Sequence, residues 1–101
     1  MIVYNLTIKV HTSILEGWLA WQQQEYVPAV LATGCFDDYK FYRLLEQDES
    51  EGPTFVLQFY TQSPEVYRRY IGQFDNKLQQ DAKAKWGETF IAFGTCMEEL
   101  C

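Results

Sequence analysis

The chain has 101 residues, of which 17% are aromatic, and its 8 Lys and Arg against 14 Asp and Glu give a formal net charge of −6. This length fits one domain over residues 1–101, and the aromatic content excludes a disordered chain, a collagen-like repeat and a disulfide-held miniprotein. The acidic balance and the scattered basic residues argue against nucleic acid or a membrane surface as a partner.

The first predicted element is a strand over residues 2–10. Its apolar and polar side chains alternate, which is the pattern of a strand with one buried face. The apolar side chains that share one face are Ile2, Tyr4, Leu6, Ile8 and Val10.

A long helix is expected to follow this strand, with Thr12 or Ser13 as its N-cap because a short hydroxyl satisfies free amides of the first turn. Pro28 lies inside this helix. It predicts a kink or a break near Gln24, because proline lacks an amide hydrogen and crowds the carbonyl four residues back. Gly34 is expected to end the helix in a left-handed conformation.

The second half of the chain contains two further strands, over residues 35–46 and 54–61, then a helix and a last strand over residues 88–98. Ser63 and Pro64 suit the N-cap and first turn of that helix. Its apolar side chains recur at steps of three and four and form one stripe: Tyr67, Tyr70 or Ile71, Phe74, Leu78 and Ala82.

The predicted order is therefore β-α-β-β-α-β, the α+β arrangement of the ferredoxin-like fold. Right-handed crossovers place both helices on one face of a four-stranded antiparallel sheet with the strand order 4-1-3-2. The other sheet face should be polar in a monomer, but Val56, Tyr60 and several side chains of the last strand make it apolar. We therefore expect a homodimer in which a second copy covers this face.

Neither a secretory signal nor a membrane-spanning segment is apparent, so a cytoplasmic location is expected. The three cysteines, Cys35, Cys96 and Cys101, are interpreted as plain thiols. With His11 as the single histidine, neither a metal nor a cofactor is expected. The acidic segment 46–53 predicts a solvated turn between two strands, with a weak divalent-cation site as the alternative.

Polar side chains embedded in the apolar strands are the candidate binding residues, because buried polar groups must find partners. Arg43 could hold a carboxylate or an enolate oxygen through its planar guanidinium group. Two interpretations remain open for these side chains: the polar end of a pocket, or a structural network that joins strands or subunits. The polar candidates are Asn5, Arg43, Gln58 and Tyr60, and the aromatic walls would be Tyr4, Trp18, Trp21 and Tyr26.

Several short motifs together resemble one family of small bacterial proteins known as a domain of unknown function. The resemblance covers nearly the whole chain, and the family is grouped with the dimeric α/β barrels alongside the antibiotic-biosynthesis monooxygenase type. It implies a ferredoxin-like dimer and no particular reaction. The motifs are Tyr4-Asn5, Trp18-x-x-Trp21, the run 28–36 from Pro28 to Phe36, Arg43-Leu-Leu45, Gln58-Phe-Tyr60, and Phe90-Ile-Ala-Phe93 with Thr95.

This chain departs from the family pattern at Tyr26, where relatives often carry a histidine. A tyrosine cannot directly replace an imidazole in acid–base or metal chemistry, because its ordinary pKa is about 10 rather than about 6.5.

Three functions follow as hypotheses, and no catalytic motif selects among them. The first is a cytoplasmic homodimer whose barrel binds a small, partly aromatic or anionic molecule. The second is a cofactor-independent monooxygenase or isomerase, in which the protein supplies a dry pocket and a polarising Arg43 or Tyr26. The third is a purely structural or protein-interaction module.

Overall fold

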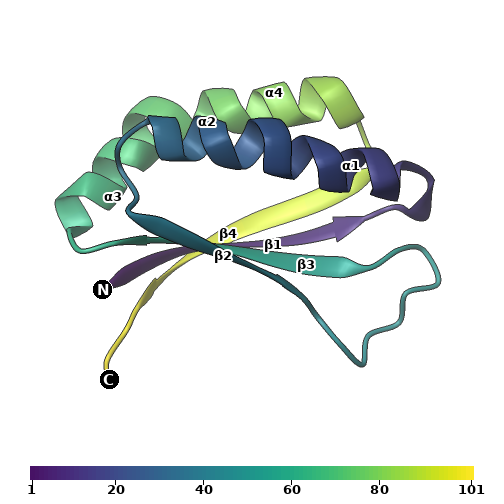
Figure 1. Ribbon diagram of the computed structural model, residues 1–101, viewed down its shortest axis with the longest axis horizontal. Coiled ribbons are helices and arrows are strands. Elements are labelled where there is room, and N and C mark those ends of the chain that lie inside the picture. Colours follow the sequence, from purple (N-terminus) through teal and green to yellow (C-terminus); the bar gives the residue numbers. More distant parts are fainter.

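The computed structural model covers all 101 residues and places one layer of helices over a four-stranded sheet (Figure 1). Strands β1 and β3 form the centre of this sheet, and β2 and β4 form its edges. The elements in chain order are β1 (Ile2–Val10), η1 (Thr12–Ile14), α1 (Leu15–Trp21), η2 (Gln22–Tyr26), α2 (Val27–Ala32), β2 (Asp38–Arg43), β3 (Thr54–Thr61), α3 (Pro64–Tyr70), η3 (Ile71–Asp75), α4 (Asn76–Trp86) and β4 (Phe90–Glu98).

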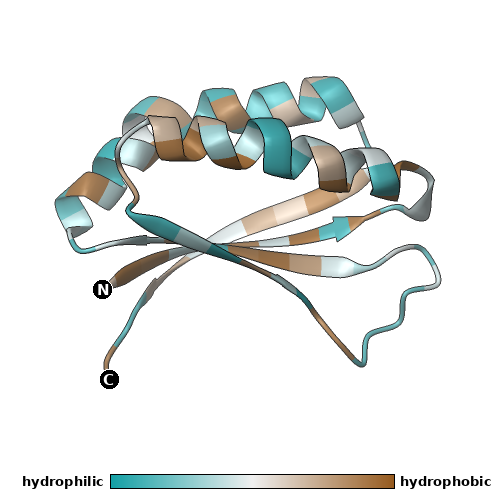
Figure 2. Cartoon of the chain, viewed as in Figure 1, coloured by the Kyte–Doolittle hydropathy of each residue, from teal (hydrophilic) through white to brown (hydrophobic).

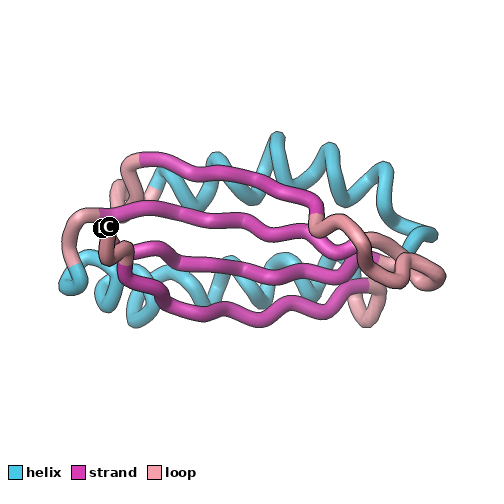
Figure 3. Tube along the Cα trace, turned by 90° about the horizontal axis from the view of Figure 1, so that it is seen from below, coloured by secondary structure: helices cyan, strands magenta, loops and turns pink.

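The strand order is β2-β3-β1-β4, and every pair of neighbours is antiparallel. This is the predicted order read from the opposite edge, so the ferredoxin-like fold is confirmed. All helices lie on one face of the sheet (Figure 1), and no element crosses the other face when the molecule is seen from below (Figure 3). No helix has the length and apolar character needed to span a bilayer.

The register of the strands assigns each side chain to one face, because directly paired residues point the same way. Tyr4 of β1 pairs with Phe59 of β3 and with Cys96 of β4, and this row faces the helices. The next row, in which Asn5 pairs with Gln58 and Thr95, faces the open side. Figure 2 shows apolar segments along β1, β3 and β4.

The core lies between the helices and the sheet and is rich in aromatic side chains. Trp18 of α1 stacks on Phe55 with 5.3 Å between ring centroids, and Phe36 meets Tyr70 edge to face at 4.8 Å. Pairs of this kind add about 0.5–1.5 kcal/mol beyond the area that they bury. Many of the aromatic residues of the chain therefore pack in the core between the helices and the sheet.

Of the two predicted N-caps, the one at α3 is confirmed and the one at the first helical segment is wrong. Ser63 caps α3 by accepting a hydrogen bond from the Val66 amide, as predicted. The first helical segment is instead capped by His11, whose Nδ1 accepts from the Ser13 amide, so neither Thr12 nor Ser13 is the cap. An imidazole nitrogen accepts a hydrogen bond as a hydroxyl oxygen does, so His11 can act as the N-cap in place of the two hydroxyl residues that follow it.

Each long helix is interrupted by one wide turn of π-helix. In η2 the Val27 amide donates to the Gln22 carbonyl, five residues back, immediately before Pro28. The break predicted near Gln24 is thus a π-turn, which widens the helix where the proline ring would meet the carbonyl of that residue. The second π-turn, η3, was not predicted, because no proline or glycine pair marks it.

The second strand is shorter than the predicted 35–46, since it runs only over Asp38–Arg43. Gly34, with φ at +75°, ends the helical segment as expected. Cys35 and Phe36 then point into the core before the strand begins, and both are buried. The acidic segment 46–53 forms the loop between β2 and β3, and it projects away from the helices (Figure 1).

Candidate functional site

A carboxylate and three tyrosine hydroxyls meet between the helices and the sheet. The Tyr4 hydroxyl on β1 donates to Asp75 Oδ1 at 2.8 Å. Gln79 Nε2 donates to the Tyr26 hydroxyl at 2.9 Å and also approaches Asp75 Oδ1 at 3.4 Å. Tyr70 lies beside these groups, and we call the five residues together, Tyr4, Tyr26, Tyr70, Asp75 and Gln79, the Asp75 cluster.

Two members of the Asp75 cluster are the last residues of the two π-turns. Turn η2 ends at Tyr26 and turn η3 ends at Asp75, on the two helical segments that lie side by side over the sheet (Figure 1). Gln79 follows Asp75 by four residues, one turn along α4, so both side chains share a helix face. π-turns inside α-helices frequently occur at functional sites.

The tyrosines of the Asp75 cluster remain protonated near neutral pH. Burial raises the pKa of Tyr4, Tyr26 and Tyr70, and the negative charge of Asp75 raises all three further. Desolvation and a nearby like charge both disfavour the phenolate. These hydroxyls can therefore donate hydrogen bonds to a ligand, but they do not act as bases.

Three buried polar atoms of the helical layer have no hydrogen-bond partner of regular geometry within the protein. They are the hydroxyl of Tyr70, Oε1 of Gln22 and Nε1 of Trp86. An unpaired buried polar atom costs about 1–3 kcal/mol. Such atoms are expected where a water molecule or a ligand group completes the hydrogen bonding.

A small pocket lies next to the Asp75 cluster, between α1, α4 and β4. Its volume is about 20 Å³, enough for roughly one water molecule. Gln79 is its one polar lining side chain. The full lining is Leu6, Ile8, Trp18, Trp21, Tyr26, Gln79, Ala82, Phe90 and Ala92.

A larger groove of about 360 Å³ adjoins this pocket along the edge of β4. The two share Gln79, Phe90 and Ala92, and the groove adds Lys83, Gly87, Glu88 and Ile91 toward the solvent. Its size falls within the range of small-molecule sites, roughly 300–1,000 Å³. We call the pocket and the groove together the α4–β4 cleft.

The structure brings only some of the candidate residues together. Trp18 and Tyr26 line the α4–β4 cleft, as does Trp21, and Tyr4 reaches it through Asp75 and Gln79. The four polar candidates on the strands lie elsewhere, so the polar and aromatic candidates do not form one pocket within a single chain.

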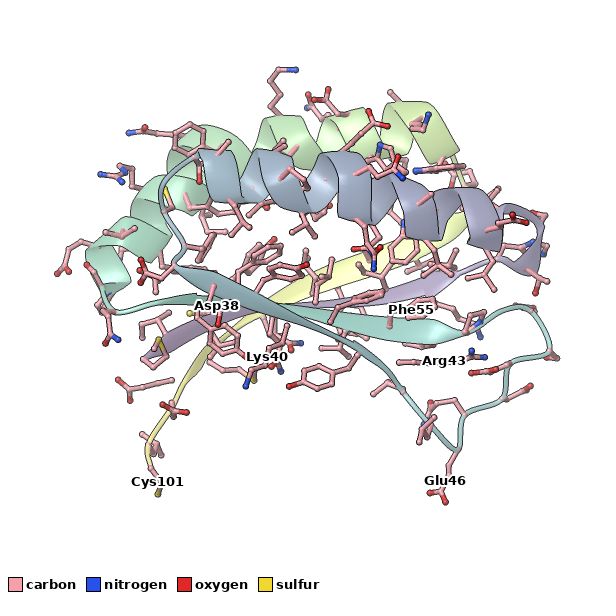
Figure 4. All side chains as sticks on the ribbon, in the orientation of Figure 1. Asp38, Lys40, Arg43, Glu46, Phe55 and Cys101 are labelled. Atoms are coloured by element: carbon pink, nitrogen blue, oxygen red, sulfur yellow. The ribbon has the colours of Figure 1, made fainter.

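Arg43 stands apart at the exposed end of β2. Its Nε donates to Glu49 Oε2 at 3.2 Å, and its Nη2 donates to Glu49 Oε1. Figure 4 shows it above the loop that carries Glu46, far from the termini. Its guanidinium is therefore occupied by a carboxylate of its own chain rather than facing the cleft.

Asn5, Gln58 and Tyr60 form a network on the open sheet face. Gln58 Nε2 donates to Asn5 Oδ1 at 3.1 Å, and the Tyr60 hydroxyl donates to Gln58 Oε1 at 2.6 Å. Lys40 lies over the Tyr60 ring at 5.7 Å from its centroid, on the side of the sheet away from the helices (Figure 4). The polar groups of this network satisfy one another without a ligand.

The sequence reasoning missed Asp75, Tyr70 as a polar group, and Gln79. A signal for them was present: Asp75 stands three residues before Leu78 and four before Gln79, within the apolar stripe of its helix. A carboxylate on an apolar face needs a partner. The three cysteines are free thiols, and no three His, Cys, Asp or Glu side chains gather in a way that could hold a metal ion.

The sequence matches one family model over residues 1–100, and that family is described as a domain of unknown function, DUF4286. The chain therefore belongs to this family. No functionally curated protein shows significant sequence similarity to it.

Solved structures of similar fold share little sequence with the chain. An ethyl tert-butyl ether (EthD) family protein from Bacillus halodurans has a TM-score of 0.72 at 14% identity, covering 99% of this chain and 100% of its own. A dimeric ferredoxin-like protein from an uncultured marine organism has a TM-score of 0.72 at 8% identity, covering 99% and 95%. An antibiotic biosynthesis monooxygenase-like protein from Nitrosomonas europaea has a TM-score of 0.67 at 14% identity, covering 100% of both chains. At these identities the likeness extends to the fold alone.

Proposed function

We propose that this member of the DUF4286 family is a homodimer that binds a small, partly aromatic molecule in the α4–β4 cleft. The observation that carries the proposal is an apolar, aromatic-walled cleft whose one inner polar side chain, Gln79, is held in place by Tyr26 and Asp75. Apolar walls with a few well-placed polar groups are typical of ligand sites.

The two parts of the cleft would hold two parts of a ligand, which we call its body and its tip. The groove of about 360 Å³ can hold the body, whereas the inner pocket of about 20 Å³ admits a group the size of a water molecule. The tip would meet Gln79 and the Tyr26 hydroxyl. The body would lie against Phe90 and Ala92 of β4, which line both parts.

Ligand binding can be followed by thermal shift and by tryptophan fluorescence, because Trp18 and Trp21 line the pocket. A library of small aromatic molecules should contain compounds that stabilise the protein and change its fluorescence. Gln79→Ala should abolish these effects, whereas Gln80→Ala, on the exposed side of α4, should preserve them. Equal responses in both variants, or a library without a stabilising compound, would overturn the proposal.

The homodimer is proposed to form through the open sheet face. That face exposes large apolar side chains, with Phe93 at 60% and Ile91 at 68% exposure. A soluble monomer rarely leaves such a patch uncovered. Its polar centre, the Asn5–Gln58–Tyr60 network, is already hydrogen-bonded, so a partner can cover it without creating unpaired groups.

A second copy of this chain is the occupant that the surface fits best. Asp38 and Lys40 lie two residues apart on the same face of β2, and a two-fold axis can set each against its opposite charge on the partner. A dimeric ferredoxin-like protein is among the proteins of similar fold, which supports the same assembly here. Light scattering at low micromolar concentration should give twice the 11.9 kDa chain mass, and a monomer would contradict the proposal.

A cofactor-independent oxygenase or isomerase is the second candidate, favoured by the position of Asp75 beside the cleft. In this candidate Asp75 accepts a proton from a bound substrate, and the protonated tyrosines stabilise the resulting anion. Arg43 has no part in it, because Glu49 holds that side chain away from the cleft. Oxygen consumption, or exchange of a ligand proton with deuterated solvent, in the presence of compounds that bind would test it, with Asp75→Asn as the variant expected to lose activity.

A further inference from the structure

We propose that the α4–β4 cleft selects aromatic amines, with the cationic ammonium group in the inner pocket and the ring in the outer groove. This inference rests on the proposed function, and it names the class of ligand. It departs from the expectation of an anionic ligand, which was based on Arg43.

No basic side chain balances the negative charge of Asp75. The ion pairs in the chain join Arg43 to Glu49, Lys77 to Asp81 and Lys83 to Glu88, and none involves Asp75. The charged or titratable groups that act on Tyr4, Tyr26 and Tyr70 are Asp75 and other tyrosines. The half-buried Asp75 therefore holds an uncompensated negative charge next to Gln79, the polar side chain of the inner pocket, and charge interactions in such a partly buried setting are stronger than in water.

The side-chain amide of Gln79 can accept a further hydrogen bond. Its amide nitrogen is already engaged with the Tyr26 hydroxyl and with Asp75, whereas its amide oxygen makes no hydrogen bond within the protein. A ligand tip that meets this oxygen must donate. An ammonium group has three donors and no acceptor, whereas a carboxylate has acceptors only and would face both an amide oxygen and the charge of Asp75.

Aromatic side chains form much of the wall of the inner pocket. Trp21 and Tyr26 stack on each other with 5.6 Å between their centroids, and Trp18 completes the wall. The π-systems of indole and phenol rings attract cations, and they do so more strongly when water is excluded. An ammonium group is also about the size of the single water molecule that the pocket admits.

The buried hydroxyl of Tyr70 lies next to the same carboxylate. This residue is fully buried beside Asp75 and Tyr26, and its hydroxyl makes no hydrogen bond of regular geometry to either of them. A hydroxyl in this state beside a carboxylate is expected where a ligand group or a water molecule completes the hydrogen bonding. A positively charged donor, directly or through a water molecule, does so without creating a new unpaired group.

Three indole compounds of similar size test the proposal: tryptamine, indole-3-acetate and uncharged 3-methylindole. Tryptophan fluorescence of the protein is obscured by indole ligands, so their affinities should be measured by calorimetry. We expect tryptamine to bind about tenfold or more tightly than either of the other two, because the carboxylate meets a like charge and the methyl group leaves the polar atoms unpaired. Asp75→Asn should remove this preference, and Asp81→Asn, an exposed carboxylate on the same helix, should keep it.

A measurement on the unmodified protein covers the case in which Asp75→Asn fails to fold. Added salt should weaken the binding of tryptamine and leave that of 3-methylindole nearly unchanged. If the indoles bind with equal affinity, or if indole-3-acetate binds best, the amine preference is wrong while the proposed binding function stands. If none of the three binds, the preference and the proposed function in this cleft are both refuted.

Discussion

Tyr4 and Asp75 are 71 residues apart in the sequence, and the hydroxyl of the first donates to the carboxylate of the second at 2.8 Å. This bond joins the central strand β1 to the π-turn η3, and it thereby fixes the helical layer over the sheet. A hydrogen bond to a charged group contributes about 1.5–3 kcal/mol to stability. It also orients the carboxylate that lies beside Gln79, the polar side chain of the inner pocket.

The first prediction concerns this bond directly. Tyr4→Phe keeps the ring in place and removes the hydroxyl, so we expect the free energy of unfolding to fall by about 1–3 kcal/mol in chemical denaturation. Tyr39→Phe is the control, since that ring is 37% exposed and its hydroxyl makes no hydrogen bond to Asp75. A loss no larger in Tyr4→Phe than in the control would show that the bond contributes nothing to stability.

The second prediction concerns Gly94, against which the Tyr4 ring packs. A Cβ atom at this position would lie 2.8 Å from Cε1 of Tyr4, closer than two non-bonded carbon atoms approach in proteins. Gly94→Ala should therefore displace the ring or the strand and cost about 1–3 kcal/mol in thermal or chemical unfolding.

Gly72→Ala in η3 is the matched control for this substitution. A Cβ there meets nothing within 4 Å, and alanine favours a helix by up to about 1 kcal/mol over glycine. We expect this variant to be as stable as the original protein or more so. Equal effects at the two glycines would contradict the packing of Tyr4 on β4.

The third prediction concerns alkaline pH. Tyr4, Tyr26 and Tyr70 have a raised pKa in the folded chain, whereas in the unfolded chain they ionise at roughly pH 10. Above that pH the unfolded chain binds fewer protons than the folded chain, so stability is intact below it and falls as the pH rises further.

Denaturant titrations on both sides of roughly pH 10 measure this loss, and ultraviolet absorbance measures the ionisation itself. Three of the seven tyrosines should ionise only together with unfolding. Absorbance showing that all seven ionise in the folded protein at the ordinary tyrosine pKa would refute the burial described for the Asp75 cluster.

The fourth prediction concerns the open sheet face. Phe93→Lys changes a side chain that is 60% exposed in the single chain, so the stability of a monomer should change by about 0.5 kcal/mol or less. In the proposed dimer the same change places a charge inside the interface, and the mass from light scattering should fall to that of one chain. Ile71→Lys, on η3 in the helical layer, should remain dimeric, and dimerisation of both variants would refute this interface.

Much of the fold follows from local patterns in the sequence. The alternation in residues 2–10 predicts β1 with its bounds, and the serine and proline at 63 and 64 predict the start of α3. These signals are local, because a strand face and a helix cap each depend on a few neighbouring residues. The length of β2 is not local: Phe36 leaves the strand because Tyr70, far along the chain, packs against it.

The candidate site was harder to predict than the fold. Polar residues on the strands were predicted to share a pocket with Tyr4. The alternation of side chains places Asn5 and Tyr4 on opposite faces of β1, so they cannot line one pocket in a single chain. Asp75 and Gln79 were not predicted as site residues, because they occur among the apolar residues of the second predicted helix. Their meeting with Tyr26 depends on two π-turns, and the second of these is marked in the sequence by a single glycine, Gly72, without a proline.

The two π-turns also bear on how the site could change during evolution. Each turn amounts to one additional residue within an otherwise regular helix, and deleting that residue would rotate everything on one side of it by about 100° relative to the other. A relative with a one-residue gap at positions 22–26 or 71–75 would therefore point its equivalent of Tyr26 or Asp75 away from the cleft, even if the amino acid were the same. Among the members of this family, the length of the two helices should show which proteins have kept the site.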